Sequence, residues 1–373
     1  MKKAIAAFAL AAAAALSASA AETNTFRVRA GSYNIRCITD KDTDDRAWSN
    51  RKGNLVSLVK DISFDVVGFQ EVRETQKTYL NSNLSGYTLF AGTISGSSEY
   101  LPVAYKISRF ERIDGGTFWL SDTPNNKSKF SDSQYYRICT WVLLRDKTTL
   151  GRMIFANTHL DLKEAARPKQ MRVVMNFLKS YISDGVHPVV VGDMNCYENE
   201  STIVEATGTL RDAAIEADAV SGPWRTYNAW TYVNPATEPT TEYALTLPVS
   251  GRNPLGGKRI DFVLVSESAQ VDSYVVRNDT QPNKEVYPSD HYPVYADLTL
   301  HVRNLVQKGR FKVEVMADCP VAGQRRFVLT NGAGLTSIEN IDFKLPKWVE
   351  RAAVEDGEIV IYTKPKCTTV FLR

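Results

Sequence analysis

Five short polar clusters recur between residues 27 and 300, and they lie at the boundaries of apolar runs. Three close such a run: Phe69-Gln-Glu71, Asn157-Thr-His159-Leu-Asp161 and Gly192-Asp-Met-Asn195. A fourth, Arg259-Ile-Asp261, opens one, and the fifth places Asp290 beside His291 between two prolines. Short apolar runs predict buried strands. Strand ends can aim several carboxylates and imidazoles at one point, so the pattern predicts a polar site built on a sheet.

Alternating strand-like and helix-like segments predict a mixed α/β fold. The strand-like runs are 28–33, 65–69, 101–105, 138–144, 153–157, 188–191, 260–265 and 294–300. Apolar residues at steps of three and four predict helices over 55–62 and 171–182. The very apolar runs 189–191 and 263–265 are typical of strands buried on both faces. We therefore expect mixed sheets covered by helices.

The sequence pattern changes after Leu300. Phe311, Val313 and Val315 alternate with charged residues, and turn clusters at 331–332 and 356–357 separate the later apolar runs. This alternation predicts a small β-rich accessory module over 305–373, following a larger domain over 27–300.

The first twenty residues have the pattern of a secretory signal peptide. A basic start is followed by an apolar run over 4–16 and by small residues at 18–20. We therefore expect export to the periplasm or the medium of a bacterium. No later stretch is apolar for long enough to cross a bilayer. Cys319 and Cys367 both lie in the tail, and they are candidates for a disulfide although sequence alone does not fix connectivity.

The polar clusters contain the groups that phosphate-ester hydrolysis requires: metal ligands, a water-activating base and phosphate donors. Mg²⁺ prefers one or two carboxylates together with waters and substrate oxygens. Glu71 is the leading candidate ligand, with Asn34 at the end of the first strand beside it. Asp193 and Asn195 alternate after a strand, so they face one side, where one positions water and the other holds phosphate. Each residue taken alone also fits a turn or a cap.

Two of the four histidines, His159 and His291, have an aspartate nearby at a strand or loop end. A carboxylate beside an imidazole fixes its tautomer and raises its basicity, which suits a general base. Asp261, on a strand, could be the partner of His291 while Asp290 faces the metal. The occurrence of all these residues in one chain is stronger evidence for a hydrolytic site than any single residue.

The ordered set of motifs resembles the endonuclease/exonuclease/phosphatase superfamily, the fold group of DNase I, in particular its secreted bacterial members. The matching motifs run from Ser32-Tyr-Asn-Ile-Arg36 and Gly68-Phe-Gln-Glu71 to Arg259-Ile-Asp-Phe262 and Ser289-Asp-His291, in family order. Further similarity lies in 116–121 and 137–141. The resemblance implies a four-layered α/β sandwich, with two mixed sheets flanked by helices, and hydrolysis with Mg²⁺ or Mn²⁺.

The resemblance also implies roles for individual residues. Glu71 would bind the metal with Asn34 beside it, and Asp290 would assist on the metal side. In the catalytic group, Asp193 would orient water, Asn195 would contact the scissile phosphate, Asp261 would pair with the catalytic His291, and His159 would hydrogen-bond the phosphate. Arg137 is a candidate phosphate donor, or an ordinary surface arginine.

The chain departs from the family pattern at Asn228, where relatives often carry a histidine. Asn228 lies in a loop-like segment over 221–258 that is rich in aromatic residues. We expect this segment to shape the substrate pocket, or its aromatic residues to pack beneath the loop, and Asn228 is a candidate for substrate binding.

The charge balance bears on the substrate. Without Lys2 and Lys3 the chain has 43 basic and 42 acidic residues, a net charge of +1. A near-neutral chain does not indicate a nucleic-acid groove. We therefore favour an exported metal-dependent hydrolase of a small or lipid-like phosphate ester. A secreted nuclease and a non-catalytic binding protein remain the alternatives, and the sequence leaves open mono- or diesterase activity, the number of metal ions and the oligomeric state.

Overall fold

The computed structural model of the protein describes residues 25–302, apart from 93–95, 98, 184–185 and 253–257, and the backbone of six short segments beyond residue 302. The chain divides into two compact units between Val302 and Arg303. The expected signal peptide and the expected Cys319–Cys367 disulfide lie outside the described residues. Among the helices of the described residues, none is long and apolar enough for a membrane span.

The first unit alternates strands and helices along the chain. They are β1 (Thr25–Asn34), η1 (Asp44–Arg46), α2 (Trp48–Ile62), β2 (Val66–Gln70), α3 (Glu74–Asn83), β3 (Tyr87–Phe90), β4 (Val103–Lys106), β5 (Phe110–Trp119), β6 (Ile138–Asp146), β7 (Arg152–His159), α4 (Arg167–Ser183), β8 (His187–Asp193), α5 (Ser201–Thr207), β9 (Leu210–Asp212), α6 (Ala213–Glu216), β10 (Val220–Ser221), α7 (Thr241–Leu245), α8 (Val249–Arg252), β11 (Asp261–Ser266), β12 (Gln270–Val276) and β13 (Val294–His301).

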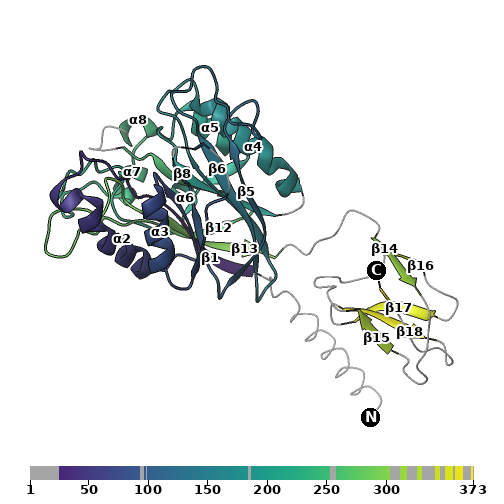
Figure 1. Ribbon diagram of the computed structural model, residues 1–373. Helices are drawn as coiled ribbons and strands as arrows, with labels where there is room; N and C mark the ends of the chain where they lie inside the picture. Colours follow the sequence, from purple (N-terminus) through teal and green to yellow (C-terminus); the bar gives the residue numbers. More distant parts are fainter. Residues whose placement is uncertain are drawn as a thin grey trace, which may run out of the picture. The chain divides into compact units, whose positions relative to one another are not determined.

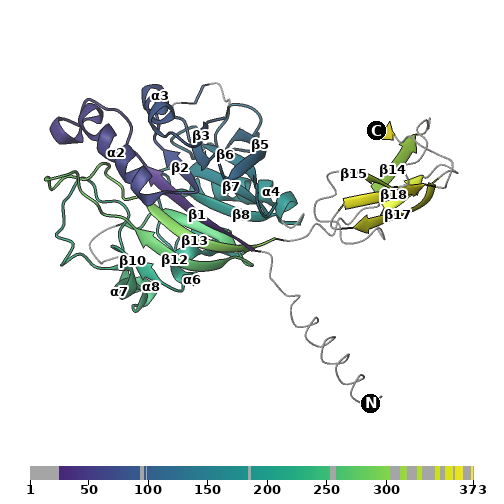
Figure 2. The same ribbon diagram turned by 90° about the horizontal axis from the view of Figure 1, so that it is seen from below.

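These strands form two mixed sheets. A seven-stranded sheet has the order β10-β12-β13-β1-β2-β4-β3, and a six-stranded sheet has the order β5-β6-β7-β8-β11-β9. Helices α2 and α3 flank the first sheet, and α4 and α5 flank the second (Figure 1). In the turned view, β1 and β13 run side by side, with α2 outside them (Figure 2). The predicted four-layered α/β sandwich is confirmed.

Side-chain alternation explains the layers. Val189 and Val191 of β8 belong to the central core between the sheets, whereas Val190 packs in the outer core with Met171 and Val174 of α4. Strand β11 behaves alike, because its alternate residues enter different cores. Leu55 and its neighbours on α2 form a third core with the outer face of the first sheet. Strands between two apolar layers are buried on both faces, as their continuous apolar runs predicted.

The second unit contains short strands only among its described residues. They are β14 (Phe311–Met316), β15 (Arg326–Leu329), β16 (Ile341–Lys344), β17 (Val349–Glu355), β18 (Glu358–Thr363) and β19 (Phe371–Leu372). They form two three-stranded sheets, ordered β16-β14-β19 and β15-β18-β17. The predicted β-rich character of the C-terminal module is confirmed.

Candidate active site

Strand register places three of the predicted site residues in one row. His159 ends β7, Asp193 ends β8 and Asp261 begins β11. In the parallel pair β7–β8, His159 is opposite Asp193, and in the antiparallel pair β8–β11, Asp193 is opposite Asp261. Segments about a hundred residues apart in sequence therefore deliver their functional side chains to the same edge of the six-stranded sheet.

The second sheet contributes from its own strand ends. Asn34 ends β1 opposite Gln70, which ends β2, and Glu71 follows directly. The Nδ2 atom of Asn34 donates to Asp193 Oδ2 at 3.0 Å and to Glu71 Oε1 at 3.2 Å. Its Oδ1 accepts the backbone N–H of Arg36 at 3.0 Å. Asn34 thus joins a carboxylate of one sheet to a carboxylate of the other.

A buried amide pair behind the site fixes the two sheets to each other. Gln70 Nε2 donates to Asn157 Oδ1 at 2.7 Å, and Asn157 Nδ2 donates to the carbonyl oxygens of Phe69 and Pro102 at 2.9 and 3.1 Å. Both amides are fully buried. Because an unpaired amide is costly in such surroundings, this network specifies one relative placement of the sheets. It explains why Gln70 at the end of β2 and Asn157 near the end of β7 are polar although neither lines the cavity.

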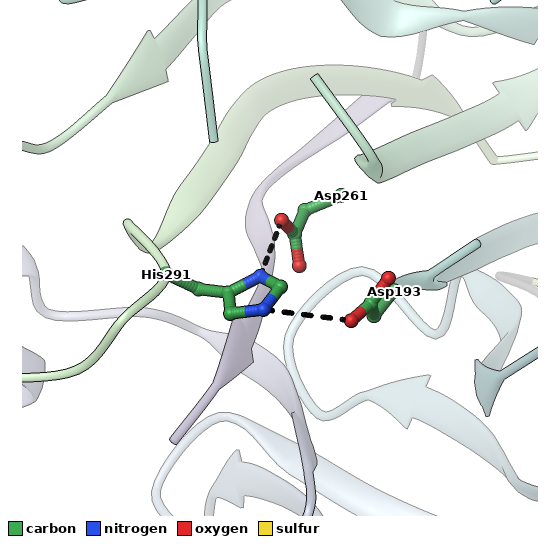
Figure 3. A group of neighbouring side chains, drawn as sticks. All are labelled: Asp193, Asp261 and His291. Carbon is green, nitrogen blue, oxygen red and sulfur yellow. Dashed lines mark hydrogen bonds and ion pairs between the residues drawn. The ribbon is translucent and has the colours of Figure 1, made fainter. Parts of the chain in front are cut away.

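Two imidazole–carboxylate pairs face Asp193. His291 Nδ1 lies 2.9 Å from Asp261 Oδ2, and its Nε2 lies 3.7 Å from Asp193 Oδ2 (Figure 3). From the other side, His159 Nε2 lies 3.6 Å from the same oxygen, and its Nδ1 lies 3.3 Å from Glu99 Oε2. Each ring is therefore held at Nδ1 by a carboxylate and presents Nε2 toward one point.

The charges around the rings favour their protonated forms. Burial lowers the pKa of His291, but Asp261 and Asp193 outweigh it and raise that pKa to about 10. Burial and Arg137 lower the pKa of His159, yet Glu99 and Asp193 raise it above its ordinary value. These charges favour a proton on each ring, and because both Nδ1 atoms face polar partners, the Nε2 atoms are the ones that point toward Asp193.

Glu99 is a site residue that the sequence analysis missed. Its Oε1 lies 2.6 Å from Arg137 Nη1, which in turn lies 3.0 Å from His159 Nδ1, and all three residues are buried. Burial raises the pKa of Glu99, but His159 and Arg137 lower it more, to about 2. Arg137 is thus a buried member of the site, not a surface arginine. Glu99 lies outside any strand or helix, so neither the periodicity of apolar residues nor a sequence motif indicated it.

One cavity of about 480 Å³ collects these groups. It is lined by Arg36, Cys37, Glu71, Arg73, Glu99, Tyr135, Arg137, His159, Leu162, Asp193, Asn195, Tyr227, Lys258, Ile260, Asp290 and His291. Of the ten predicted site residues, seven line it. Asn34 and Asp261 are fully buried and act through Glu71, Asp193 and His291, and Asn228 does not line the cavity.

The side chain of Asn228 is used within its own loop. Its Nδ2 donates to the carbonyl oxygen of Ser289 at 3.1 Å, and its Oδ1 accepts the N–H of Trp230 at 2.8 Å. Its backbone N–H donates to the carbonyl oxygen of Asp290 at 2.8 Å. Asn228 therefore fixes the backbone of the segment that carries His291, and substrate contact by this residue remains a prediction.

Asn195 lies in the cavity wall with its amide nitrogen already engaged. Its Nδ2 donates to the carbonyl oxygen of Leu160 at 3.0 Å, and its backbone N–H donates to Asp193 Oδ1 at 2.9 Å. Asn195 and Glu71 both have positive φ, 51° and 61°. Non-glycine residues adopt this region at a cost, and such strain concentrates at functional sites.

The oxygen donors around Glu71 fit a hard divalent cation. Glu71 Oε2 accepts the N–H of Cys37 at 3.0 Å, and burial raises the pKa of Glu71, but His159 and that hydrogen bond hold it below its usual value. Burial raises the pKa of Asp290, and the charge of Glu71 raises it further. The half-buried carboxylate of Glu71 and the buried carboxylate of Asp290 repel each other, which makes them a suitable donor set for Mg²⁺ or Mn²⁺.

A second set of potential metal ligands is Asp193, Asp261 and His291, whose ligand atoms lie within 4.8 Å of one another. The hydrogen bond between His291 and Asp261 already occupies one nitrogen and one oxygen of this set (Figure 3). The structure therefore has a possible metal site at this cluster, and a separate pair of carboxylates, Glu71 and Asp290, on the wall of the same cavity.

Arg51, on α2, holds together the backbone segments that carry the site. The side chain is fully buried. Its Nη1 donates to the carbonyl oxygens of Ile35 and Pro288 at 2.7 and 3.1 Å, its Nη2 to that of Arg36 at 2.8 Å, and its Nε to that of Arg46 at 2.8 Å. One guanidinium thus links the loop after β1 to the loop before β13, and no sequence signal distinguished it from other helical arginines.

Comparison with known proteins agrees with this geometry. The model of the Endonuclease/Exonuclease/phosphatase family matches residues 31–291, and the chain belongs to this family. A comparison with curated proteins found no match.

Among solved structures, an endonuclease/exonuclease/phosphatase from Bacteroides vulgatus is 27% identical with a TM-score of 0.63, covering 74% of this chain and all (100%) of that one. The mannosyl-6-phosphatase Bt3783 of Bacteroides thetaiotaomicron is 25% identical with a TM-score of 0.63, covering 73% of this chain and 99% of that one. D. rerio TDP2, complexed with single strand DNA product, is 16% identical with a TM-score of 0.53 over 73% of this chain and 98% of that one, which shows the fold alone.

Proposed function

We propose that this protein is a divalent-metal-dependent phosphatase that hydrolyses a small phosphate monoester, such as a sugar phosphate, outside the cytoplasm. The observation that carries the proposal is the convergence of His159 Nε2 and His291 Nε2 on Asp193 Oδ2, at 3.6 and 3.7 Å, in one cavity. Two protonated donors on either side of a carboxylate suit a phosphoryl group that must be attacked by water.

The residues divide the work as follows. Asp193 orients the attacking water and accepts its proton as the oxygen–phosphorus bond forms. His159, with Arg137 behind it, donates to a phosphoryl oxygen and offsets the charge that develops there. His291 gives its Nε2 proton to the leaving alkoxide, and Asp193 then returns a proton to His291. In this scheme His291, held at Nδ1 by Asp261 and with a raised pKa, acts first as a proton donor and then as the acceptor of the proton that Asp193 returns.

A bound divalent cation would supply Lewis-acid neutralisation of the phosphoryl charge. Glu71 and Asp290 are the residues that would hold it, with Asn34 orienting Glu71 through its 3.2 Å hydrogen bond. Mg²⁺ or Mn²⁺ fits these oxygen donors, whereas the cavity wall offers no thiolate pair among the residues described that would favour zinc.

Three observations support a small monoester. The cavity is walled by cationic side chains, Arg36, Arg73, Arg137 and Lys258, that suit a compact dianion. The net charge of the chain without Lys2 and Lys3 is +1, which disfavours a polyanionic substrate. A relative of 25% identity bears the name of a mannosyl-6-phosphatase. For export, the support is the signal-like pattern of residues 1–20.

The test is a substrate panel with the purified chain: hexose phosphates, nucleoside monophosphates, an aryl phosphodiester, sphingomyelin and DNA, each with Mg²⁺ or Mn²⁺ and with a chelator. We expect turnover of hexose phosphates that His291→Ala abolishes and that chelation removes reversibly. Faster cleavage of DNA than of any monoester would replace the proposal with the nuclease alternative. Cell fractionation with N-terminal sequencing tests export, with Ala21 expected as the first residue.

A further inference from the structure

Two exposed side chains at the rim of the cavity have no role in the chemistry proposed above. Tyr135 is 41% exposed and Leu162 is 52% exposed, and both line the cavity. Single exposed apolar residues are ordinary, but two together on the wall of a strongly charged cavity indicate contact with an organic group.

The rim is held rigidly by the carboxylate of Asp161, which is fully buried. Its Oδ1 accepts the backbone N–H of Gln134 at 3.1 Å and that of Lys163 at 2.9 Å, and its Oδ2 accepts that of Tyr135 at 2.8 Å. One side chain thus ties the segment of Tyr135 to the segment of Leu162. Asp161 is therefore a support for the rim, which explains its place in the His159 cluster.

The ring of Tyr135 is also fixed in orientation. The side-chain amide of Gln134 lies 2.8 Å from the Tyr135 hydroxyl, and the Arg137 guanidinium carbon lies 5.0 Å from the ring centroid. A pre-ordered aromatic ring loses little conformational entropy when it binds a partner. Arg137 also contacts His159, so the ring stands one side chain away from the phosphoryl donors.

We propose that Tyr135 and Leu162 form the leaving-group subsite and that it receives the ring of a hexose phosphate. The inference rests on the proposed phosphatase function and names its substrate class. A phosphate that accepts a hydrogen bond from His159, with Arg137 behind the imidazole, directs its ester substituent toward Tyr135, whose ring lies against the Arg137 guanidinium. The apolar C–H face of a sugar packs on the ring, while the hydroxyls of the sugar face the polar residues of the cavity wall, which include Lys258 and Arg73.

The chain offers a matched control in the neighbouring residue. Tyr136 is 42% exposed, as exposed as Tyr135, but it packs edge-on against Trp119 with centroids 6.0 Å apart and does not line the cavity. Tyr135→Ala and Tyr136→Ala therefore remove the same group from the same segment, once from the subsite and once beside it. Tyr135→Phe keeps the ring and removes only the hydroxyl.

The experiment measures kcat and KM for mannose 6-phosphate and the inhibition constant of inorganic phosphate in the wild type and in all three variants. We expect Tyr135→Ala to raise KM by about fivefold to tenfold, the size of a lost aromatic contact, with the phosphate inhibition constant within about twofold of wild type. Tyr136→Ala and Tyr135→Phe should remain close to the wild-type KM.

The outcomes separate this inference from the function on which it rests. If the wild type does not hydrolyse hexose phosphates, the proposed function itself fails. The subsite is refuted if the wild type is active but Tyr135→Ala leaves KM unchanged. It is also refuted if Tyr135→Ala weakens the binding of inorganic phosphate as much as the binding of substrate. If Tyr135→Ala raises KM for a nucleoside monophosphate but not for mannose 6-phosphate, the ring of Tyr135 binds a nucleobase, and the sugar assignment is overturned.

Discussion

Replacing Glu99 with glutamine tests whether this carboxylate is the electrostatic support of the site. The substitution keeps the size of the side chain and removes its charge. It leaves Arg137, 2.6 Å away, and His159, 3.3 Å away, as buried cations without their closest counter-charge. Removing one partner of a buried ion pair is costly because the other partner remains desolvated.

The magnitude follows from the pKa of Glu99, which the fold lowers from 4.5 to about 2. At about 1.4 kcal/mol per pH unit, that difference corresponds to about 3 kcal/mol of stability at neutral pH. A carboxyl group with a lowered pKa stabilises the fold at a pH above its pKa in the unfolded chain. This stabilisation is lost as the pH falls toward its pKa in the folded protein. The deficit of Glu99→Gln should therefore be complete near pH 7 and about half as large near pH 3.5.

The assay is urea unfolding of both proteins from about pH 7 to about pH 3.5. Glu111→Gln is the matched control, because Glu111 pairs with Arg145 at the same 2.6 Å but with side chains 49% and 39% exposed. An exposed pair contributes at most about 1 kcal/mol, so the control should lose little. A Glu99→Gln deficit that is constant over this pH range, or no larger than that of the control, would refute the electrostatic reasoning.

Three further substitutions test the framework of the site. Arg51→Met removes four hydrogen bonds to carbonyl oxygens, two of them buried and two partly buried, and should cost about 3 kcal/mol or more in urea unfolding. Arg51→Lys should restore only part of this stability, because lysine lacks the planar guanidinium fork. Gly192→Ala should cost more than about 3 kcal/mol of stability in a thermal melt, because φ is +153° and a Cβ would collide with a backbone carbonyl of β7. Gly53→Ala, in an open helical position, is the control and should be neutral or stabilising in the same assay. Asp261→Asn removes the carboxylate that supports His291 at 2.9 Å and should lower kcat by about 10²-fold to 10⁴-fold. It also leaves a buried imidazole without its counter-charge, so the melting temperature should fall, and kcat is measured well below it. An unaltered pH–rate profile would contradict the pairing.

The sequence predicted the strands that carry the candidate site because their signals are local. The apolar run of Val189–Val191 and the polar residues that follow it placed Asp193 at a strand end, and the structure has it there. The same reasoning placed Asn34 and Glu71 correctly with respect to β1 and β2. Motif order then indicated the family that the comparisons show.

What local signals could not decide was which groups touch. Asp193 lies opposite both His159 and Asp261 only because β8 pairs in parallel with β7 and antiparallel with β11. Hydrophobic period fixes the face of a residue, but it carries no information about the partner strand or its register. Asn228, a candidate for substrate binding, instead uses its amide on the backbone of the His291 segment.

By itself, then, the order of residues determined the alternating strands, the two-sided burial of the central ones and the identities of most polar groups at their ends. Only tertiary structure decided that Glu99, from an irregular segment, supports His159, that Arg51 joins two distant loops, and that Tyr135 stands at the rim of the cavity. The physical reason is that period and propensity act over a few residues, whereas charge pairing and cavity shape depend on distances that exist only after the sheets have packed.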